Sequence, residues 1–222
     1  MKDTRKHNMK PTGVHTSKDR PARKSTAREY AEAVIMAVVL TFFVRAFVIQ
    51  AFRIPTGSMM DTLLIGDFLF VNKFIYGPKI PYTAVRLPGL RSPRPGDIMV
   101  FKYPGDLKRD FIKRCIAVGG QTVEIRNKVV YVDGIAGDEP YVIRSDPRIL
   151  PKEVSPRDNM DPLYVPQGYL FMMGDNRDNS LDSRFWGPLD VRLVKGKAMI
   201  IYWSHKEKWY VPRLDRVFHV IR

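Results

Sequence analysis

The pattern of apolar and polar positions divides the chain into a polar start, one apolar segment and a long remainder of short alternating runs. Residues 1–30 are polar and basic, which is typical of a disordered tail. The twelve residues AVIMAVVLTFFV, 33–44, carry no charge, and AFVIQAF continues the apolar run after Arg45. A helix over residues 33–52 would be about 30 Å long, roughly one hydrocarbon thickness. We therefore predict a transmembrane anchor over residues 31–52.

Two other interpretations of the apolar segment remain open, a buried core helix and a cleaved signal peptide. A signal peptide fits less well, because the charged lead is long and no convincing small-x-small site precedes a clean mature start. Arg45 lies near the end of the span, where its side chain can reach the interface. By the positive-inside rule the basic tail lies in the cytoplasm and the chain after Phe52 lies outside. The run AMIIYW, residues 198–203, is too short for a second span and is predicted to be a buried strand.

After the apolar segment, turn signals separate short runs that are typical of strands. These runs lie at residues 67–77, 96–105, 110–120, 122–134, 168–176 and 195–203. The fourth run is expected to form a hairpin that turns near Asn127 and Lys128. Residues 139–166, rich in proline and charge, are predicted to be a surface loop or an extended excursion. The fold class predicted for residues 53–222 is mainly β, an antiparallel sheet domain behind a single N-terminal transmembrane helix.

The net charge and the cysteine content limit which partners and metal sites the protein can have. The net charge is +14, and residues 1–30 contribute nine Lys/Arg against three Asp/Glu. Such a positive charge makes nucleic acid and anionic lipid candidate partners. No nucleic-acid-binding module is recognisable, so we expect no nucleic acid partner. Cys115 is the single cysteine, which excludes an intramolecular disulfide and a cysteine-based zinc site.

The stretch IPTGSMMDTL, residues 54–63, places a serine on a glycine-containing turn directly after the apolar segment. Ser58 could serve there as a helix cap or as a nucleophile held at a membrane surface. A serine hydroxyl is a poor nucleophile until a base takes its proton. A histidine base is not excluded, but no motif surrounds any of the four histidines, His7, His15, His205 and His219.

A lysine can also act as the base if burial lowers its pKa and keeps the amine neutral. Lys113, in RDFIKRCIAV, is the candidate. In a strand Lys113 shares a face with Phe111 and Cys115, whereas Arg114 shares the other face with Ile112. Both faces are largely apolar, so periodicity does not show which cation is buried. A single lysine in a strand is most often exposed.

The segment GDNRDNSLDSRFWGPL, residues 174–189, begins with polar residues and glycine, which predicts a loop rich in side-chain hydrogen bonds. A calcium loop fits it poorly, because Ser180 and Trp186 stand where an EF-hand has its glycine and its glutamate. A structural loop held by Asp–Arg pairs and a loop that also carries active-site hydroxyls both remain open. We expect no metal and no other cofactor.

Three of these stretches, FRIPTGSMMDTLLIGDFLFV, DFIKRCIAVGG and GDNRDNSLDSRFWGPL, resemble the signature segments of the bacterial type I signal peptidases. Their order and their place behind an N-terminal apolar segment also match, and the resemblance covers roughly residues 31–204. It implies a membrane-anchored serine endopeptidase that removes signal peptides from exported preproteins after small-x-small sites. It also implies a phospholipid membrane as a partner and a location in the bacterial cytoplasmic membrane, with the N-terminus in the cytoplasm.

The resemblance implies a role for three residues in the chemistry. Ser58 matches the nucleophile of the family, and Lys113 matches its general base. Thr56 stands where a hydroxyl joins the backbone N–H of the nucleophile in holding the oxyanion, a position at which the family usually has serine.

Other positions match supporting and substrate-binding residues. Ser180 matches the serine that orients the lysine amine, and Asp182 and Arg184 match an ion pair behind the site. Trp203 and Trp209 match tryptophans near the membrane-facing surface. Pockets for small substrate residues such as alanine are implied at Phe52, Ile54, Pro55, Met59, Leu63, Phe111 and Ile112.

The sequence departs from the family pattern at Asp61, where proline is common, at Arg53, and at VGGQTV after the lysine. These departures bear on turn geometry and cleavage preference more than on activity. Two rival functions remain. One is a self-cleaving Ser-Lys protease of the LexA-type repressors, which are soluble and carry a DNA-binding module. The other is a non-enzymatic, membrane-tethered scaffold that binds anionic lipid through its positive charge.

Overall fold

The computed structural model describes residues 26–80, 83, 85–206 and 211–222. Residues 1–25 of the predicted tail and Trp209 therefore lie outside the described residues. The prediction of a disordered tail is wrong for residues 26–30, because the helix already begins at Thr26. The chain divides into two units, residues 1–39 and residues 40–222, of which the second holds the β-sheets.

The apolar segment begins as the helix α1 (Thr26–Phe43) and continues as one π-helical stretch, η1 (Val44–Val48). Within the described ranges, this is the one helix that is long and apolar enough to cross a membrane. The prediction of a helix through Phe52 is wrong at its end, because residues Ile49–Arg53 form the strand β1.

Pairing with a distant strand explains this earlier end of the helix. Strand β1 runs antiparallel to β2 (Asp67–Asn72), with Ile49 opposite Asn72 and Arg53 opposite Phe68. Backbone hydrogen bonds to β2 replace those that a further helical turn would make, so tertiary pairing overrides the local apolar pattern. The Lys73 ammonium donates to the carbonyl oxygens of Arg45 and Ala46, at 3.1 Å each, and so caps the end of the helix.

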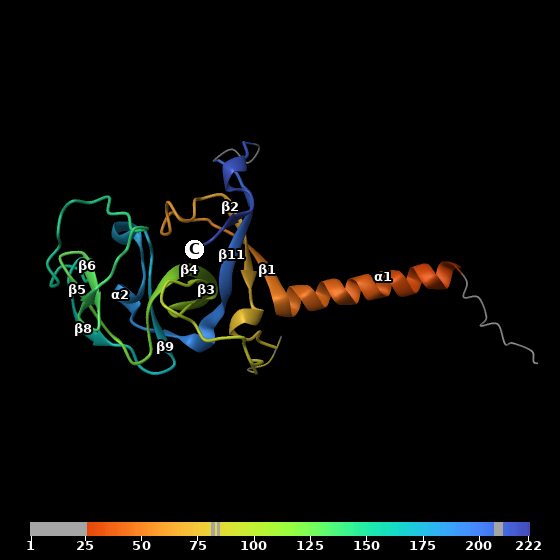
Figure 1. Ribbon diagram of the computed structural model, residues 1–222, viewed down its shortest axis with the longest axis horizontal. Helices are drawn as coiled ribbons and strands as arrows, with labels where there is room; N and C mark the ends of the chain where they lie inside the picture. Colours follow the sequence, from red (N-terminus) through yellow and green to blue (C-terminus); the bar gives the residue numbers. More distant parts are fainter. Residues whose placement is uncertain (1–25, 81–82, 84, 207–210) are drawn as a thin grey trace, which may run out of the picture. The chain divides into compact units, whose positions relative to one another are not determined.

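The body contains two antiparallel sheets, which confirms the predicted fold class (Figure 1). The larger sheet has the order β1-β2-β11-β3-β4-β9-β10, and β12 pairs with β11. Its remaining strands are β3 (Ile98–Tyr103), β4 (Asp106–Val118), β9 (Tyr169–Met173), β10 (Leu189–Asp190), β11 (Val194–Ser204) and β12 (His219–Val220). The run at residues 198–203 is thus part of a strand, as predicted.

The smaller sheet has the order β7-β6-β5-β8. Its hairpin of β5 (Thr122–Arg126) and β6 (Val129–Val132) turns at Asn127 and Lys128, which have φ of 48° and 69°. This confirms the predicted hairpin. The excursion over residues 139–166 is not entirely loop, because it contains β8 (Met160–Tyr164), which pairs with β5. The fourth strand is β7 (Ile135–Ala136).

Short helical turns connect the strands of the larger sheet. They are η2 (Phe74–Tyr76), η3 (Arg177–Asn179), α2 (Ser183–Trp186), η4 (Val191–Leu193) and η5 (Leu214–Arg216). Figure 1 shows β5, β6 and β8 together at one end of the body and β1, β2 and β11 at the other.

Candidate active site

Ser58 lies on the segment that leaves β1 and returns as β2. Ile54, directly after β1, donates its N–H to the carbonyl of Asp67 at 2.8 Å. Two further backbone bonds close the turn around Ser58, from Met60 N–H to Gly57 O and from Leu63 N–H to Met59 O. Because Ile54 before Ser58 and Met59 and Leu63 after it are buried, the turn is fixed on both sides of a half-buried serine.

Lys113 lies in β4, between its neighbours β3 and β9. Its side chain is only 4% exposed, and its ammonium nitrogen Nζ lies 2.5 Å from Ser58 Oγ. The ring of Phe111 covers the amine at 5.5 Å from the ring centroid. The structure therefore brings together the two residues that the sequence predicted to form the reactive pair.

Burial lowers the pKa of Lys113 from its ordinary value of 10.5 to about 8. The charges of Asp182 and Asp175 act in the opposite direction, and they are outweighed by desolvation of the amine. A substantial fraction of the amine is therefore neutral just above neutral pH, which is the state that can accept a proton.

This pKa gives a prediction for the pH dependence of peptide cleavage. We expect kcat/KM to rise with pH up to about 8 and then to level off, because only the neutral amine takes the serine proton. At two pH units below that value, about a hundredth of the plateau is expected. The measurement is the pH profile of cleavage of one substrate, with circular dichroism as the control for folding. A profile that stays flat down to pH 4 would contradict an amine base.

Asn176 joins the serine turn to the polar segment after β9. Its backbone N–H donates to Ser58 O at 3.2 Å, and its Nδ2 donates to Gly57 O at 3.1 Å. Gly174 allows this approach, since a Cβ at that position would collide with Ser58 O and Ser180 Oγ. The sequence did not identify Asn176 as a residue that positions Ser58. Its place in the polar GDN run indicated only that it makes side-chain hydrogen bonds.

Arg114, the neighbour of Lys113 in β4, is also buried, and it forms a two-pronged ion pair with Asp175. The distances are 2.9 Å from Nε to Oδ1 and 2.7 Å from Nη2 to Oδ2. Asp175 also accepts a bond of 2.6 Å from the Thr62 hydroxyl, four residues after Ser58. Lys113 and Arg114 are therefore both buried, and Arg114 ties β4 and the serine turn to the same carboxylate.

Asp182 and Arg184 form the ion pair that the sequence predicted, with 2.8 Å between Arg184 Nε and Asp182 Oδ1. Asp182 also accepts the N–H of Gly174 at 3.1 Å and caps α2 through the N–H of Arg184. Burial acts to raise the pKa of Asp182, but the charge and hydrogen bonds of Arg184 outweigh it and lower that pKa. The pair therefore stays ionised behind the GDN segment.

Ser180 is buried, and its hydroxyl has no partner at full hydrogen-bond geometry among the described residues, although its interaction with the Asp182 carboxylate helps to lower the pKa of Asp182. The expected bond from Ser180 to the Lys113 amine is therefore not formed here, where the amine bonds to Ser58 instead. The Ser180 Oγ lies beside Gly174, which in turn lies beside the carbonyl of Ser58.

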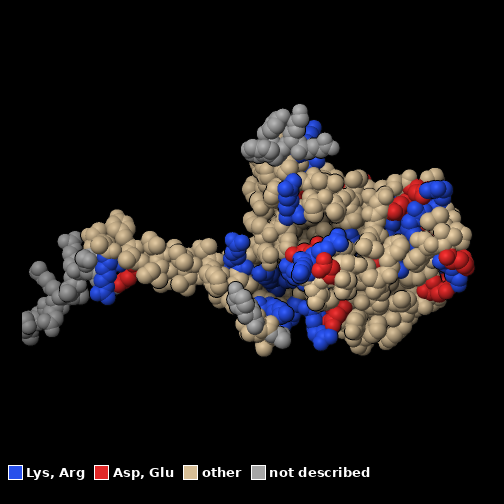
Figure 2. Space-filling view, turned by 180° about the vertical axis from the view of Figure 1, so that it is seen from behind, with Lys and Arg blue, Asp and Glu red and all other residues tan. Residues whose placement is uncertain are grey.

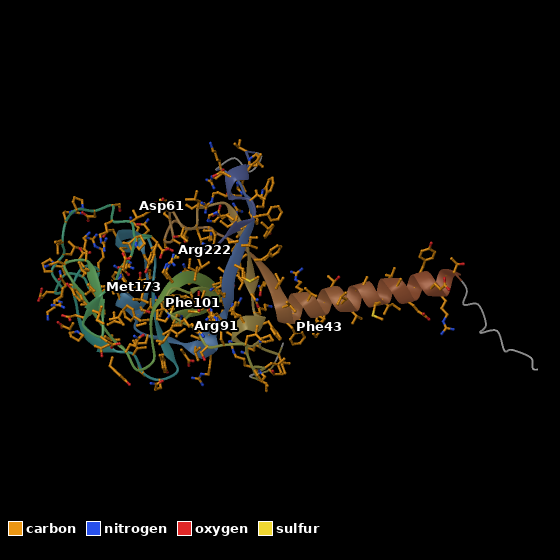
Figure 3. All side chains as sticks on the ribbon, in the orientation of Figure 1. Phe43, Asp61, Arg91, Phe101, Met173 and Arg222 are labelled. Atoms are coloured by element: carbon orange, nitrogen blue, oxygen red, sulfur yellow. The ribbon has the colours of Figure 1, made fainter. Side chains whose placement is uncertain are left out.

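Thr56 is exposed and precedes the serine turn. Across the described ranges, neither its hydroxyl nor the backbone N–H of Ser58 donates a hydrogen bond. Both groups are thus available to a substrate that reaches Ser58. In the same loop Asp61 has φ of 70°, a value that proline cannot adopt, so the loop departs locally from the family pattern. Asp61 and Arg222, labelled in Figure 3, line one open cavity beside this loop.

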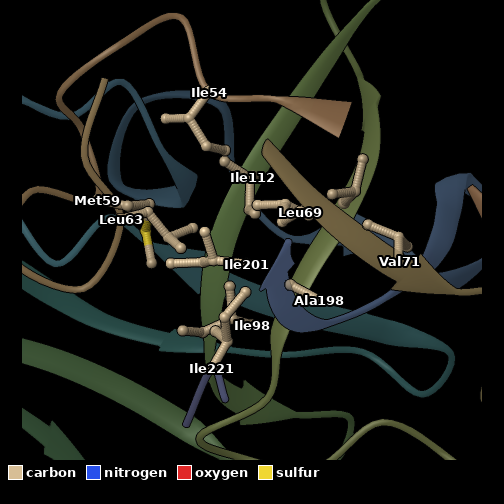
Figure 4. Packing of buried hydrophobic residues seen from close by; sticks show 11 residues of the cluster. Ile54, Met59, Leu63, Leu69, Val71, Ile98, Ile112, Ala198, Ile201 and Ile221 are labelled. Atoms are coloured by element: carbon tan, nitrogen blue, oxygen red, sulfur yellow. The ribbon is translucent and has the colours of Figure 1, made fainter. Parts of the chain in front are cut away.

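The seven predicted pocket residues fall into two groups by exposure. Ile54, Met59, Leu63 and Ile112 are buried in one core cluster with Leu69 (Figure 4). These four side chains shape the wall behind the serine turn. The other three remain accessible in part: Phe52, Pro55 and Phe111.

Of the two tryptophans assigned to a membrane-facing surface, Trp203 is 40% exposed in β11. Over the described residues there is no group of three or more His, Cys, Asp or Glu side chains that could hold a metal ion.

Comparison with known proteins places this chain in the class of serine peptidases. Residues 27–203 match the signal peptidase family, peptidase S26. Signal peptidase I of Pseudomonas aeruginosa is 34% identical, over 85% of this chain and 78% of that protein. Signal peptidase I of Aquifex aeolicus is 33% identical, over 83% of this chain and 88% of that protein. A crystal structure of a signal peptidase I from Enterococcus faecalis is 30% identical and covers 48% of this chain and 97% of that one, with a TM-score of 0.39.

The chain therefore belongs to the signal peptidase family S26, and its activity is that of a signal peptidase. Membership of this family favours a signal peptidase over the two rival functions, a non-enzymatic scaffold and a repressor of the LexA type.

Proposed function

We propose that Ser58 is the nucleophile of this signal peptidase and that Lys113 is its general base. The observation that carries the proposal is the 2.5 Å contact between Ser58 Oγ and a lysine amine that is 4% exposed. A buried amine with a lowered pKa can accept the serine proton, whereas an exposed ammonium cannot.

The steps follow from this pair. The Lys113 amine takes the proton of the Ser58 hydroxyl while Oγ attacks the scissile carbonyl and a tetrahedral intermediate forms. The lysine ammonium then gives the proton to the departing amine, which leaves an ester between Ser58 and the signal peptide. A water molecule, deprotonated by the same amine, hydrolyses this ester and restores the free serine.

The neighbouring groups have supporting roles in this proposal. The Thr56 hydroxyl and the Ser58 N–H stabilise the negative oxygen of the intermediate, because neither group is engaged by the protein. Once Ser58 is acylated, the amine of Lys113 loses its partner, and Ser180 is the buried hydroxyl that can orient it. The ion pair of Asp182 and Arg184 holds the segment that carries Ser180.

We further propose that the substrates are exported preproteins that are cut after small-x-small sites. The pocket is formed by the residues assigned above, with Phe52, Pro55 and Phe111 in contact with substrate. The helix from Thr26 to Val48 spans the cytoplasmic membrane of a bacterium once, with the N-terminus in the cytoplasm and the sheets outside. Because a preprotein is tethered in the same bilayer, anchoring the enzyme there raises the effective concentration of the two.

The test is cleavage of a preprotein with an Ala-x-Ala site by the detergent-solubilised full chain. We expect one cut directly after the second alanine, identified by the mass of the mature product. The matched control is the same preprotein with both alanines replaced by phenylalanine, which should remain intact because the pocket takes small side chains. Equal cleavage of both substrates would overturn the proposed site preference.

A further inference from the structure

Six basic side chains surround a cavity of about 370 Å³ on the body, whose lining includes neither Ser58 nor Lys113. This basic pocket is lined by Lys73, Lys79, Arg86, Lys102, Arg192 and Lys195, together with Gln50, Leu107, Leu193 and Val194. Figure 2 shows Lys and Arg side chains gathered near the middle of the face it draws, with fewer Asp and Glu among them.

Two carboxylates offset only part of this charge. Asp110 contacts Lys195 at 2.8 Å and Lys102 at 3.2 Å, and Asp190 pairs with Arg192. For the other three lining cations, no carboxylate of the described residues lies within 4.0 Å. The pocket therefore holds an excess of positive charge that an anion would neutralise.

The lysines of the pocket still have N–H groups to offer. An ammonium has three donors, and Lys73 uses two of them on the carbonyls of Arg45 and Ala46. Lys195 has one charge-assisted bond, to Asp110. The Arg86 guanidinium, by contrast, donates to the carbonyls of Gly77 and Val194, so it supports the wall of the pocket.

The pocket lies at the end of the apolar helix. Lys73 contacts the carbonyls of Arg45 and Ala46, which belong to the last turn of the candidate span, and Gln50 follows that span by two residues. Burial lowers the pKa of Lys73, and the nearby charges of Lys195 and Arg45 lower it further. An anion bound beside Lys73 would relieve this repulsion at the depth where a bilayer carries its phosphate groups.

A second, apolar pocket adjoins the first. It has a volume of about 590 Å³ and shares Gln50 with the basic pocket. Its wall combines the end of the helix with β1 and β2: Leu40, Thr41, Val44, Arg45, Ile49, Ala51 and Phe70. A basic pocket that continues into an apolar one matches an amphiphile with a negative head and a hydrocarbon chain.

We propose that these two pockets form a binding site for one anionic phospholipid, with the phosphate in the basic pocket and an acyl chain in the apolar pocket. The serine and lysine of the proposed reaction do not line the site, so its main test is direct binding of the lipid, and preprotein cleavage serves only to exclude a role in substrate binding.

The experiment uses the full chain in phosphatidylcholine vesicles that contain a small fraction of spin-labelled phosphatidylglycerol. The measured quantity is the association constant of phosphatidylglycerol relative to spin-labelled phosphatidylcholine. We expect a saturable preference for the anionic lipid that falls at least fivefold in Lys73→Gln/Lys195→Gln, since each lysine near a lipid surface contributes about fivefold.

Two variants make the test specific to the pocket. Lys79→Gln/Lys102→Gln removes the other two lysines of the pocket and should lower the preference for the anionic lipid similarly. This second variant keeps the test valid if the first variant fails to fold. The matched control is Arg126→Gln/Lys152→Gln, which removes the same charge from exposed positions elsewhere. An equal loss in the control would assign the preference to general surface charge and overturn the site.

Two further arms distinguish the source of the anion. Inorganic phosphate, added at constant ionic strength against a chloride control, should not displace the lipid at millimolar concentration. Displacement by phosphate would show a site for free phosphate and overturn the lipid assignment. If all variants keep the lipid preference but raise KM only for preproteins with acidic residues before the cut, the pocket belongs to the substrate and the proposal fails.

Discussion

Replacing Ser58 with alanine, Lys113 with methionine, or both together is expected to lower kcat/KM for preprotein cleavage by the same factor, about 10⁴ or more. The reason is that neither group works without the other: a hydroxyl without a base keeps its proton, and an amine without a nucleophile has no proton to take. The 2.5 Å contact between the two atoms makes them one unit. Losses of residues that act as a unit do not add.

The measurement is the cleavage rate of one preprotein by the three variants under conditions in which the parent enzyme gives a single product. Methionine is nearly isosteric with the lysine stem, so Lys113→Met fills the same buried space, and thermal unfolding serves as the check on folding. Additive losses in the double variant would mean that Ser58 and Lys113 act independently. Turnover of Lys113→Met within tenfold of the parent would remove the lysine from the role of base.

The fold class was predictable from local patterns, whereas the pairing of Ser58 with Lys113 was implied by the resemblance to a family, because periodicity left open whether Lys113 or Arg114 is buried. Alternating runs between turns gave the strands, and the positive-φ turn at Asn127 and Lys128 was visible from its residue types. The end of the helix was not predictable in this way. Residues 46–52 continue the apolar run of the helix, and only pairing with the strand β2, which begins more than a dozen residues after them, makes residues Ile49–Arg53 a strand.

The groups that position Ser58 were missed for a related reason. Asp175 accepts bonds from Arg114 and Thr62, and Asn176 holds the carbonyls of Gly57 and Ser58. These partners are between 61 and 119 positions apart in the chain. Polar composition indicated that the GDN segment makes many hydrogen bonds, but it could not indicate to which residues.

The excursion over residues 139–166 also makes long-range contacts, and these support the segment that follows β9. Glu139 pairs with the buried Arg177 at 2.6 Å, and the carbonyl of Arg157 accepts a bond from Arg184 at 2.8 Å. Asp178 accepts from the Lys128 ammonium of the hairpin turn, also at 2.8 Å. The smaller sheet and its excursion thus brace the segment that carries Ser180 and Asp182, which a reading of the excursion as a surface loop did not anticipate.

Changing Thr56 to valine is expected to lower kcat for preprotein cleavage by about 10²–10³, the effect of removing one oxyanion donor. Valine keeps the β-branched shape of threonine and replaces only the hydroxyl by a methyl group. Since Thr56 is exposed and its hydroxyl makes no bond to the described residues, folding should be unaffected. KM should change little, because the oxyanion exists only in the transition state and the intermediate that follows.

The control is Thr56→Ser, which restores the hydroxyl without the methyl group and should retain nearly full activity. Steady-state kinetics of the two variants with one preprotein separates the contribution of the hydroxyl from that of the side-chain shape. A loss below threefold in Thr56→Val would leave the Ser58 N–H to stabilise the oxyanion without the Thr56 hydroxyl. A loss in Thr56→Ser without a loss in Thr56→Val would instead mean that Thr56 acts by fixing the backbone before Ser58, since valine keeps the β-branched side chain that restricts this backbone and serine does not.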